Sequence, residues 1–427
     1  MWERFSYYGM RSLLVLYMVK YLLPGPADSV IGLGTLRGGL ESIFGPLGPQ
    51  PFASQIYGFY TGLVYLTPLL GGLLADRVLG QRRTVIVGAS LMAAGHFMMA
   101  FEPLFLVALA VLILGNGAFK PNISTQVGGL YAPDDHRRDR AYSIFYVGIN
   151  LGAFLAPLIC GTLGEQLGWH YGFAAAGVGM TLGLVIYLAG QPSLPRDELQ
   201  KRKGAGAKAP LAPAERRGIY TLLILFLPVS LFWATYEQQG NTVALWADGF
   251  TDRSIDLWFW RGDIPVTWFQ AINPFLIFGF TPLVVSLWAR QARRGSEPST
   301  VNKMALGCAG AALSYLIMAA AAWSADGGKA SWLWIFAYFV VITVGELYLS
   351  PIGLSLVTKV APARMLSLMM GLWLATSFTG NFLAGWLGSL WSVMEKPVFF
   401  LMLAAIAALA AAIIAAFNRP LRGLTQE

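Results

Sequence analysis

Charged residues are scarce in this 427-residue chain: they make up 12% of it, whereas 56% of the residues are hydrophobic. Soluble domains contain about 25% charged residues, which keep their surfaces hydrated. A chain with so little charge, and with repeated apolar runs of about 20 residues, is typical of a polytopic membrane protein. The composition therefore disfavours a soluble enzyme or a soluble binding domain.

Cysteine and histidine are also rare, with two and three residues respectively. Cys160 and Cys308 both lie in apolar stretches, which indicates buried thiols and neither a disulfide framework nor a metal cluster. The three histidines, His96, His136 and His170, show no metal-ligand spacing. We therefore expect no metal site and no cofactor, and a haem or metal enzyme is disfavoured.

Apolar segments long enough to cross a hydrocarbon core of about 30 Å recur along the whole chain. A polar stretch rich in Pro, Lys and Arg at 191–217 divides them into two sets of six. We predict an all-α fold with an N-terminal six-helix bundle at 1–190, a cytoplasmic linker at 191–217 and a C-terminal six-helix bundle at 218–427. The twelve predicted spans are 1–23, 52–75, 84–101, 104–130, 140–163, 170–190, 218–240, 264–289, 301–323, 331–358, 365–392 and 397–417.

Basic residues are distributed unequally between the two sets of loops, and Lys and Arg collect on the cytoplasmic side of membrane proteins. The asymmetry predicts that both termini are cytoplasmic. It also explains the net charge of +8, so we expect no nucleic-acid partner. The external loops carry only Arg37, Arg253, Arg261, Lys329 and Lys396, whereas the other side includes Arg77, Arg82, Arg83, Arg137, Arg138, Arg140, Arg290, Arg293 and Arg294.

The external segment 241–263 is acidic and contains Trp246, Trp258 and Trp260. Tryptophan is enriched where a membrane protein meets the lipid headgroups. We interpret these rings as an interfacial belt that anchors the chain.

Six charged side chains lie well inside the predicted spans, where an ionised group costs about 2.5–3.5 kcal/mol at the centre of a bilayer. Two of them, Lys120 and Glu346, occupy corresponding helices of the two halves at similar depth. Transporters built from repeats place their substrate site at that depth. The alternative is that the charges form ion pairs that only fix helix packing. The six are Glu3, Arg4, Arg11, Lys120, Glu237 and Glu346.

Several short motifs resemble those of the proton-dependent oligopeptide transporters, a family of the major facilitator superfamily. The first motif of that family is similar to Glu3-Arg4-Phe5-Ser6-Tyr7-Tyr8-Gly9. Its leading Glu would fall before Met1, and the second-span position of a functional His in animal relatives is Gly58 here. Further matches are Gly71-Gly72-Leu73-Leu74-Ala75-Asp76-Arg77, Lys120-Pro121-Asn122, Phe145-Tyr146-Val147-Gly148-Ile149-Asn150, and Gly345-Glu346 with Ser350-Pro351.

The resemblance implies a major facilitator fold of twelve transmembrane helices, here without an extra helix pair between the halves. It also implies a monomer in the bacterial inner membrane that imports di- and tripeptides together with protons. Glu346 would hold the peptide amino group, and Arg4 and Lys120 its carboxylate. Other residues lining the site would be Tyr7, Tyr8, Tyr65, Asn150, Asn273, Trp373 and Ser377.

Proton coupling would then depend on carboxylates that change charge. Glu3 lies beside Arg4, and Glu237 on the seventh span is expected to pair with Arg11 on the first. Protonation of Glu237 would weaken this pair and allow one half to move against the other. Lys120 and Glu346 are also expected to take part in proton coupling and gating.

Other functions remain open at this point. A relative of the same fold that carries nitrate would need a positive pole without the negative pole of Glu346. A drug exporter of the same superfamily would not need opposed charges. A non-transporting membrane receptor or a membrane enzyme is disfavoured, because the sequence shows no large soluble domain and no nucleophile–base set.

Overall fold

The computed structural model describes residues 1–131, 135, 137–194, 197, 213–257, 260–362 and 365–417. The described chain forms two compact units, of which one comprises Met1–Lys203 with Asp263–Pro274 and the other Gly204–Gly262 with Phe275–Glu427. Most of the predicted linker 191–217 lies outside the described residues, and so does His136. The two units are treated one at a time below.

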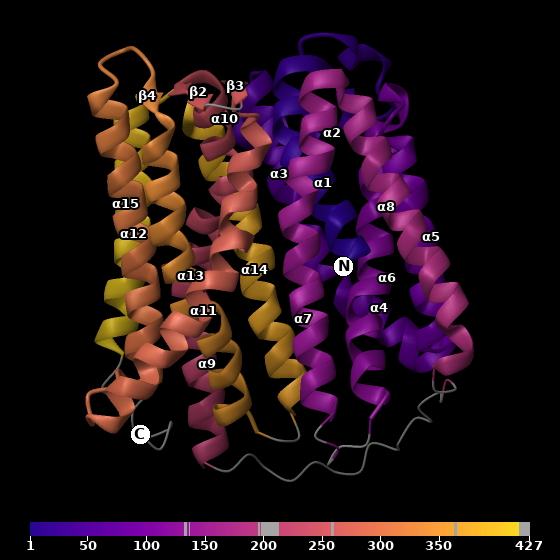
Figure 1. Ribbon diagram of the computed structural model, residues 1–427, viewed down its shortest axis with the longest axis vertical. Coiled ribbons are helices and arrows are strands. Elements are labelled where there is room, and N and C mark those ends of the chain that lie inside the picture. Colours follow the sequence, from indigo (N-terminus) through magenta and orange to yellow (C-terminus); the bar gives the residue numbers. More distant parts are fainter. Residues whose placement is uncertain are drawn as a thin grey trace. The chain divides into compact units, whose positions relative to one another are not determined.

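The first unit is built from long helices that run side by side along the vertical direction of Figure 1. Its short helical turns are η2 (Pro26–Ser29), η4 (Glu102–Leu104) and η7 (Gln191–Ser193), together with extensions of longer helices at η1 (Met18–Leu22), η3 (Ala75–Leu79), η5 (Pro157–Gly161) and η6 (Leu163–Leu167). The α-helices are α1 (Trp2–Tyr17), α2 (Leu33–Phe44), α3 (Pro49–Leu66), α4 (Pro68–Leu74), α5 (Gln81–Met98), α6 (Phe105–Gly129), α7 (Arg137–Ala156) and α8 (Trp169–Gly190).

The second unit is also helical, and its few strands are short. Its helices are α9 (Pro213–Tyr236), η8 (Glu237–Gly240), α10 (Thr242–Gly249), α12 (Thr300–Ser324), α13 (Trp332–Val360), α14 (Leu366–Ser389), η11 (Leu390–Ser392) and α15 (Lys396–Ala416). The turn η9 (Val266–Trp268) and the start of α11 (Phe269–Arg293) group with the first unit. The strands are β1 (Thr251–Asp252), β2 (Ser254–Leu257), β3 (Trp260–Asp263) and β4 (Ala330–Ser331).

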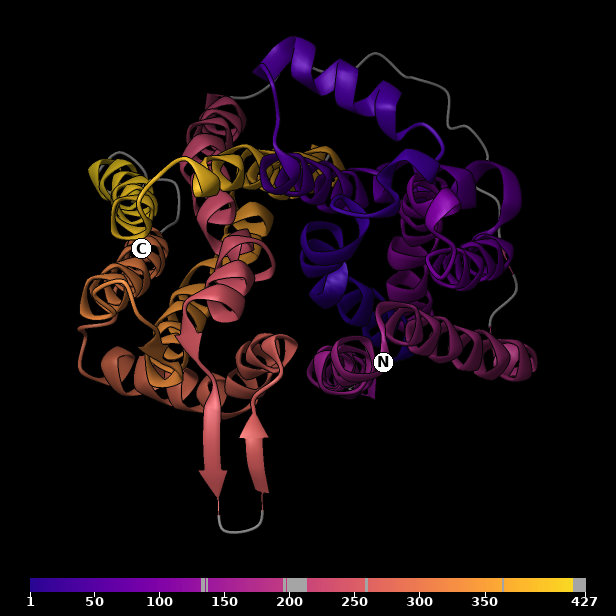
Figure 2. The same cartoon turned by 90° about the horizontal axis from the view of Figure 1, so that it is seen from above.

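The strands form two small pairs. β1 runs parallel to β4, with Thr251 opposite Ala330, and β2 pairs with β3. Figure 2 shows β2 and β3 as a ribbon that extends away from the helices of its unit.

Among the described residues, nine helical stretches are long and apolar enough to span a membrane. They correspond to nine of the twelve predicted spans, and α1 with η1, α5 and α14 correspond to the other three. The stretch α1 with η1 is less apolar because it carries Glu3, Arg4, Arg11 and Lys20. The prediction of an all-α polytopic membrane fold is confirmed.

Small residues set the spacing of the helices in the first unit. A Cβ atom on Gly71 of α4 would lie 2.0 Å from the carbonyl oxygen of Gly117 on α6, whereas one on the adjacent Gly72 would meet no atom within 4 Å. Only a glycine at position 71 therefore allows the two backbones to touch. Close backbone contact through small residues is typical of helix packing in membranes, where apolar burial alone does not drive helices together.

The structure differs from the sequence-based expectation in two places. The helix α2 was not predicted; only Leu33 and Leu40, seven residues apart on one face, are buried, so its apolar pattern is shorter than a span. The prediction that Trp246 belongs to an interfacial belt is wrong. Trp246 lies on α10, and its side chain is buried inside the protein. Its ring stacks on that of Phe250, with 5.1 Å between ring centroids. The side chains of Trp258 and Trp260 lie outside the described residues.

Candidate functional site

The first helix concentrates charge and aromatic rings on one face. Arg4, Tyr7, Tyr8 and Arg11 follow one another at helical spacing, so they form a stripe along α1. The guanidinium carbon of Arg4 lies 6.0 Å from the centre of the Tyr7 ring, and that of Arg11 lies 5.9 Å from the Tyr8 ring. Rings at these distances attract a cation through their quadrupole, which partly replaces the water that the guanidinium groups lose on burial.

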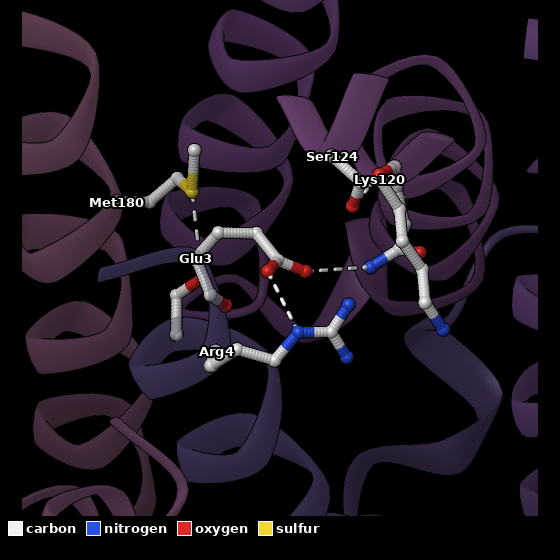
Figure 3. A network of polar contacts seen from close by, with 7 residues as sticks. Glu3, Arg4, Lys120, Ser124 and Met180 are labelled. Atoms are coloured by element: carbon white, nitrogen blue, oxygen red, sulfur yellow. Dashed lines mark hydrogen bonds and ion pairs between the residues drawn. The ribbon is translucent and has the colours of Figure 1, made fainter. Parts of the chain in front are cut away.

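Glu3 lies next to this stripe and connects α1 to α6 (Figure 3). One carboxylate oxygen lies 2.9 Å from Nε of Arg4, and the other accepts a hydrogen bond of 3.2 Å from Nδ2 of Asn116. The side chains of Glu3 and Arg4 are only 9% and 11% exposed. The structure therefore holds an ion pair that is almost fully buried and whose carboxylate is also hydrogen-bonded to a second helix.

Arg11 is held against α3. Its Nε donates a hydrogen bond of 2.8 Å to the hydroxyl of Tyr57, and its guanidinium carbon lies 5.6 Å from the centre of the same ring. The predicted partner Glu237 belongs to the second unit. The Arg11–Glu237 pair therefore stays a prediction.

Lys120 projects from α6 toward the second predicted span, where its Nζ lies 4.2 Å from the centre of the Tyr65 ring. The next residue, Pro121, lies inside α6 and interrupts its backbone hydrogen bonds. Both Lys120 and Tyr65 are half-buried.

A cavity of about 460 Å³ opens among α1, α6, α7 and α8. Its size falls within the range of small-molecule sites. Glu3, Arg4 and Lys120 contribute the charged part of its wall, so the lining contains two basic side chains and one acidic side chain. The apolar part of the wall includes Phe119, Ile123, Phe145, Ile149 and Ile186.

The two predicted asparagines are both nearly buried. Asn150 on α7 is 6% exposed and donates from Nδ2 to the Tyr146 carbonyl, one turn earlier, at 3.0 Å. Asn273 on α11 is 8% exposed and directly precedes Pro274. Neither residue lines the cavity beside Arg4 and Lys120.

In the second unit, Glu237 lies where the seventh span stops being a regular α-helix. The span passes from α9 through the 3-10 turn η8 to α10, and Asn241 between them has φ −116° and ψ −99°. Gln238 fills part of the broken region by donating to the Ala384 carbonyl of α14 at 2.9 Å. Interrupted spanning helices of this kind commonly mark binding sites in transporters, because the freed backbone groups become available for contacts.

Glu346 lies on α13 and Trp373 on α14, and these two helices pack against each other. A Cβ atom on Gly353 would lie 2.1 Å from Cζ2 of Trp373, so the indole ring covers that glycine. Glu346 lies seven residues before Gly353, on the same face of α13. Ser377 follows Trp373 by four residues and lies on the same face of α14. Glu346, Trp373 and Ser377 therefore lie on the facing sides of these two helices.

The predicted site residues thus fall into two groups. Within the first unit, Glu3, Arg4 and Lys120 line one cavity, and Tyr7, Tyr8 and Tyr65 accompany them. Within the second unit, Glu346, Trp373 and Ser377 share one helix pair. Whether the two groups share a substrate cavity stays a prediction, because they belong to different units.

The arrangement can be compared with known proteins. The sequence profile described as "POT family" matches residues 82–206 and 207–402, which together make up most of the chain. This chain belongs to the POT family. The membership confirms the resemblance drawn from the motifs at Glu3–Gly9 and Phe145–Asn150.

Curated relatives match over nearly the whole chain. A peptide transporter of Yersinia enterocolitica subsp. palearctica is 34% identical, with 91% of this chain and 85% of the relative covered. A di-/tripeptide transporter of Lactococcus lactis subsp. cremoris is 32% identical, with 98% and 93% covered.

Solved structures of the same family confirm the fold. A mutant of a peptide transporter in complex with sulfate superposes with a TM-score of 0.85 at 30% identity and covers 99% of this chain and 93% of its own. A POT family transporter in complex with a thioalcohol-conjugated peptide gives a TM-score of 0.84 at 27% identity and covers 98% and 94%. The chain therefore has the major facilitator fold that the resemblance implied.

Asn116, Tyr57 and Gln238 were not assigned to the site from the sequence. Asn116 and Tyr57 bond to Glu3 and Arg11 from other helices. A polar residue in an apolar span was the available signal for Asn116, but nothing in the sequence indicates its partner. Gln238 was signalled more clearly, since Glu237-Gln238-Gln239-Gly240-Asn241 is a polar run at the end of an apolar span.

Proposed function

We propose that this POT family protein is a proton-coupled symporter that imports di- and tripeptides by alternating access. The observation that carries the proposal is the cavity bordered by Glu3, Arg4 and Lys120. Ionisable groups are costly inside a membrane protein and are retained where function needs them. Two basic groups beside one acid favour an anionic group of the substrate at this place.

A di- or tripeptide is a zwitterion whose backbone length is nearly fixed and whose side chains vary. Arg4 and Lys120 would bind its carboxylate, and Glu346 its amino group. Asn150 and Asn273 would bond to the backbone, while Ser377 and the rings of Tyr7, Tyr8, Tyr65 and Trp373 would line the side-chain pockets. Aromatic walls supply contact area without demanding one particular side chain.

Protons are the proposed coupling ion, and no cofactor is required. Glu3 would change charge beside Arg4, and Glu237 would pair with Arg11 in one charge state only. A membrane potential supplies about 2.3 kcal/mol per charge per 100 mV. Since a tenfold concentration ratio costs about 1.4 kcal/mol, one proton per peptide supports an accumulation of about fiftyfold at that potential.

The proposed location is the bacterial inner membrane, with both termini in the cytoplasm and a monomer as the working unit. The unequal distribution of Lys and Arg between the loops supports this orientation. It places the start of α11 and the end of the fifth span on the outer side.

The function is tested by reconstituting the purified protein in liposomes and measuring uptake of radiolabelled dialanine. Uptake should require an inward proton gradient or an inside-negative potential, and dipeptides should compete whereas free amino acids and nitrate should not. Lys120→Ala and Glu346→Gln should abolish uptake. The matched controls Lys20→Ala and Glu395→Gln should retain it.

Two results would contradict the proposal. If uptake does not depend on the proton gradient, transport is not coupled to protons. If nitrate competes for uptake and dipeptides do not, the protein carries nitrate. In that case Glu346 would not serve to bind a peptide amino group.

A further inference from the structure

The end of the fifth span holds the start of α11 through one carboxylate. An oxygen of Glu165 accepts a hydrogen bond of 2.9 Å from the backbone N–H of Val266. The other oxygen accepts from the backbone N–H and the hydroxyl of Thr267, at 2.8 and 2.6 Å. Glu165 lies in η6 and its partners in η9, more than 100 residues later in the chain. One side chain thus satisfies three donors at a helix start, where the first N–H groups have no partner within the helix.

Further contacts of the same segment reinforce this attachment. The indole N–H of Trp268 donates to the hydroxyl of Thr162 at 2.8 Å, and the Gln270 side chain donates to the carbonyl of Ser12 on α1 at 3.2 Å. Gly161 faces Thr267 so closely that a Cβ atom there would lie 2.0 Å from the Thr267 hydroxyl oxygen. The start of α11 is therefore fitted against η5, η6 and α1.

The same helix belongs to both units of the chain. Its residues up to Pro274 group with the first unit, and those from Phe275 onward group with the second. Pro274 has no N–H to donate to the preceding turn, so the helix is weakened at the residue where the grouping changes. Any movement of the second unit relative to the first must either bend α11 at this point or detach its first turn.

We propose that Glu165 is a latch for the transport cycle: it holds the first turn of α11 on the N-terminal unit, and the outer end of the protein opens when that bond set is broken. The inference rests on the proposed alternating-access function. Glu165 acts as a positioning residue, because it lies on the fifth span away from Arg4 and Lys120 and binds backbone groups of this chain.

Glu165→Gln is a sharp perturbation of the latch. Glutamine has nearly the same size and shape, but its amide nitrogen is a donor and must face one of the N–H groups that the carboxylate oxygens now accept from. The substitution also removes the negative charge of Glu165, and a negative charge stabilises the N-terminal end of a helix through the helix dipole. The volume of the side chain is kept, while at least one of the three hydrogen bonds is lost.

The matched control is Glu102→Gln. Glu102 is a second partly buried carboxylate of the first unit, bonded to the hydroxyl of Tyr21 at 2.8 Å and to Nε2 of His170 at 3.1 Å. All three residues of this cluster belong to the first unit, and none lies on α11. Neutralising it changes the charge of the first unit equally but leaves the latch intact.

The experiment measures exposure of Ser12, which is 2% exposed next to the latched segment. Ser12→Cys is introduced with Cys160→Ser and Cys308→Ser, and the liposome-embedded protein is treated from outside with a membrane-impermeant maleimide. The labelling rate should rise about tenfold with Glu165→Gln, an energy of about 1.4 kcal/mol, which is the size expected for a lost helix cap. Thr267→Val, which removes only the hydroxyl donor, should give a smaller rise.

Two outcomes would overturn the latch. The first is an unchanged labelling rate in both Glu165→Gln and Thr267→Val. The second is an equal rise with Glu102→Gln, which would show general loosening. The labelling requires neither peptide nor a proton gradient. If the uptake assay shows no specificity for peptides, the proposed substrate is wrong. The labelling result still tests the latch, because it does not depend on the substrate.

Discussion

The buried pair of Glu3 and Arg4 makes a quantitative prediction. With 2.9 Å between the charged groups and an effective dielectric constant of about 20, their attraction is about 6 kcal/mol. Desolvation of two charges offsets several kcal/mol of this. The intact pair therefore contributes little net stability, but breaking it is costly. Removal of one partner leaves the other charge buried and uncompensated, at a cost of about 3–5 kcal/mol.

Glu3→Gln and Arg4→Gln should therefore each destabilise the protein, with Glu3→Gln near 3 kcal/mol because glutamine can still accept from Asn116. The double variant leaves no uncompensated charge. Its loss should fall short of the sum of the single losses by about 2–3 kcal/mol, which is the coupling expected of residues in contact.

The measurement is a double-mutant cycle of unfolding free energies in mixed detergent micelles. Lys20→Gln, which removes a charge from an exposed position of η1, serves as the control and should change the free energy little. Additive losses from Glu3→Gln and Arg4→Gln would refute the reasoning, because they would show that the two groups do not compensate each other. All variants that remove Arg4 should also lose peptide uptake, whatever their stability.

Three further variants test separate features. Gly71→Ala should cost at least about 2 kcal/mol of unfolding free energy, because the new methyl group would overlap the α6 backbone, whereas Gly72→Ala should be neutral in the same assay. Tyr57→Phe removes the acceptor of the Arg11 hydrogen bond and should cost about 1.5–3 kcal/mol; an unchanged unfolding midpoint would mean that this bond contributes nothing. Glu237→Gln should retain exchange of labelled for unlabelled peptide across liposomes but lose uphill accumulation, and normal accumulation would exclude Glu237 from proton coupling.

Apolar length predicted the spans because a segment that crosses a bilayer must satisfy its backbone internally and bury about 20 residues. That constraint acts within each segment, so a span can be predicted from the sequence without knowing which helices surround it. The interruption at Glu237–Gly240 could be anticipated only in part, since the polar run indicates a special place but not that α14 supplies the acceptor for Gln238. The burial of Trp246 could not be anticipated, because its ring also packs against Phe400 of α15, 5.5 Å away between ring centroids and more than 150 residues later in the chain.

The charges were predictable for the same local reason, but their partners were not. Arg4, Tyr7, Tyr8 and Arg11 are spaced to share a face on any helix, and an ionisable residue in an apolar span is visible by itself. Glu165 escaped notice because it lies close to a loop, where a carboxylate is ordinary. Only the folded chain shows that it binds backbone groups of η9.

The composition of the cavity wall argues for function more strongly than the number of buried charges does. A purely structural ion pair balances itself, and apolar residues of similar volume would stabilise the bundle at least as well. Glu3 pairs with Arg4, and Lys120 borders the same cavity with its Nζ 4.2 Å from the centre of the Tyr65 ring. The lining side chains therefore carry one more positive than negative charge. We propose that in this chain of the POT family the carboxylate of a peptide binds on this side of the cavity.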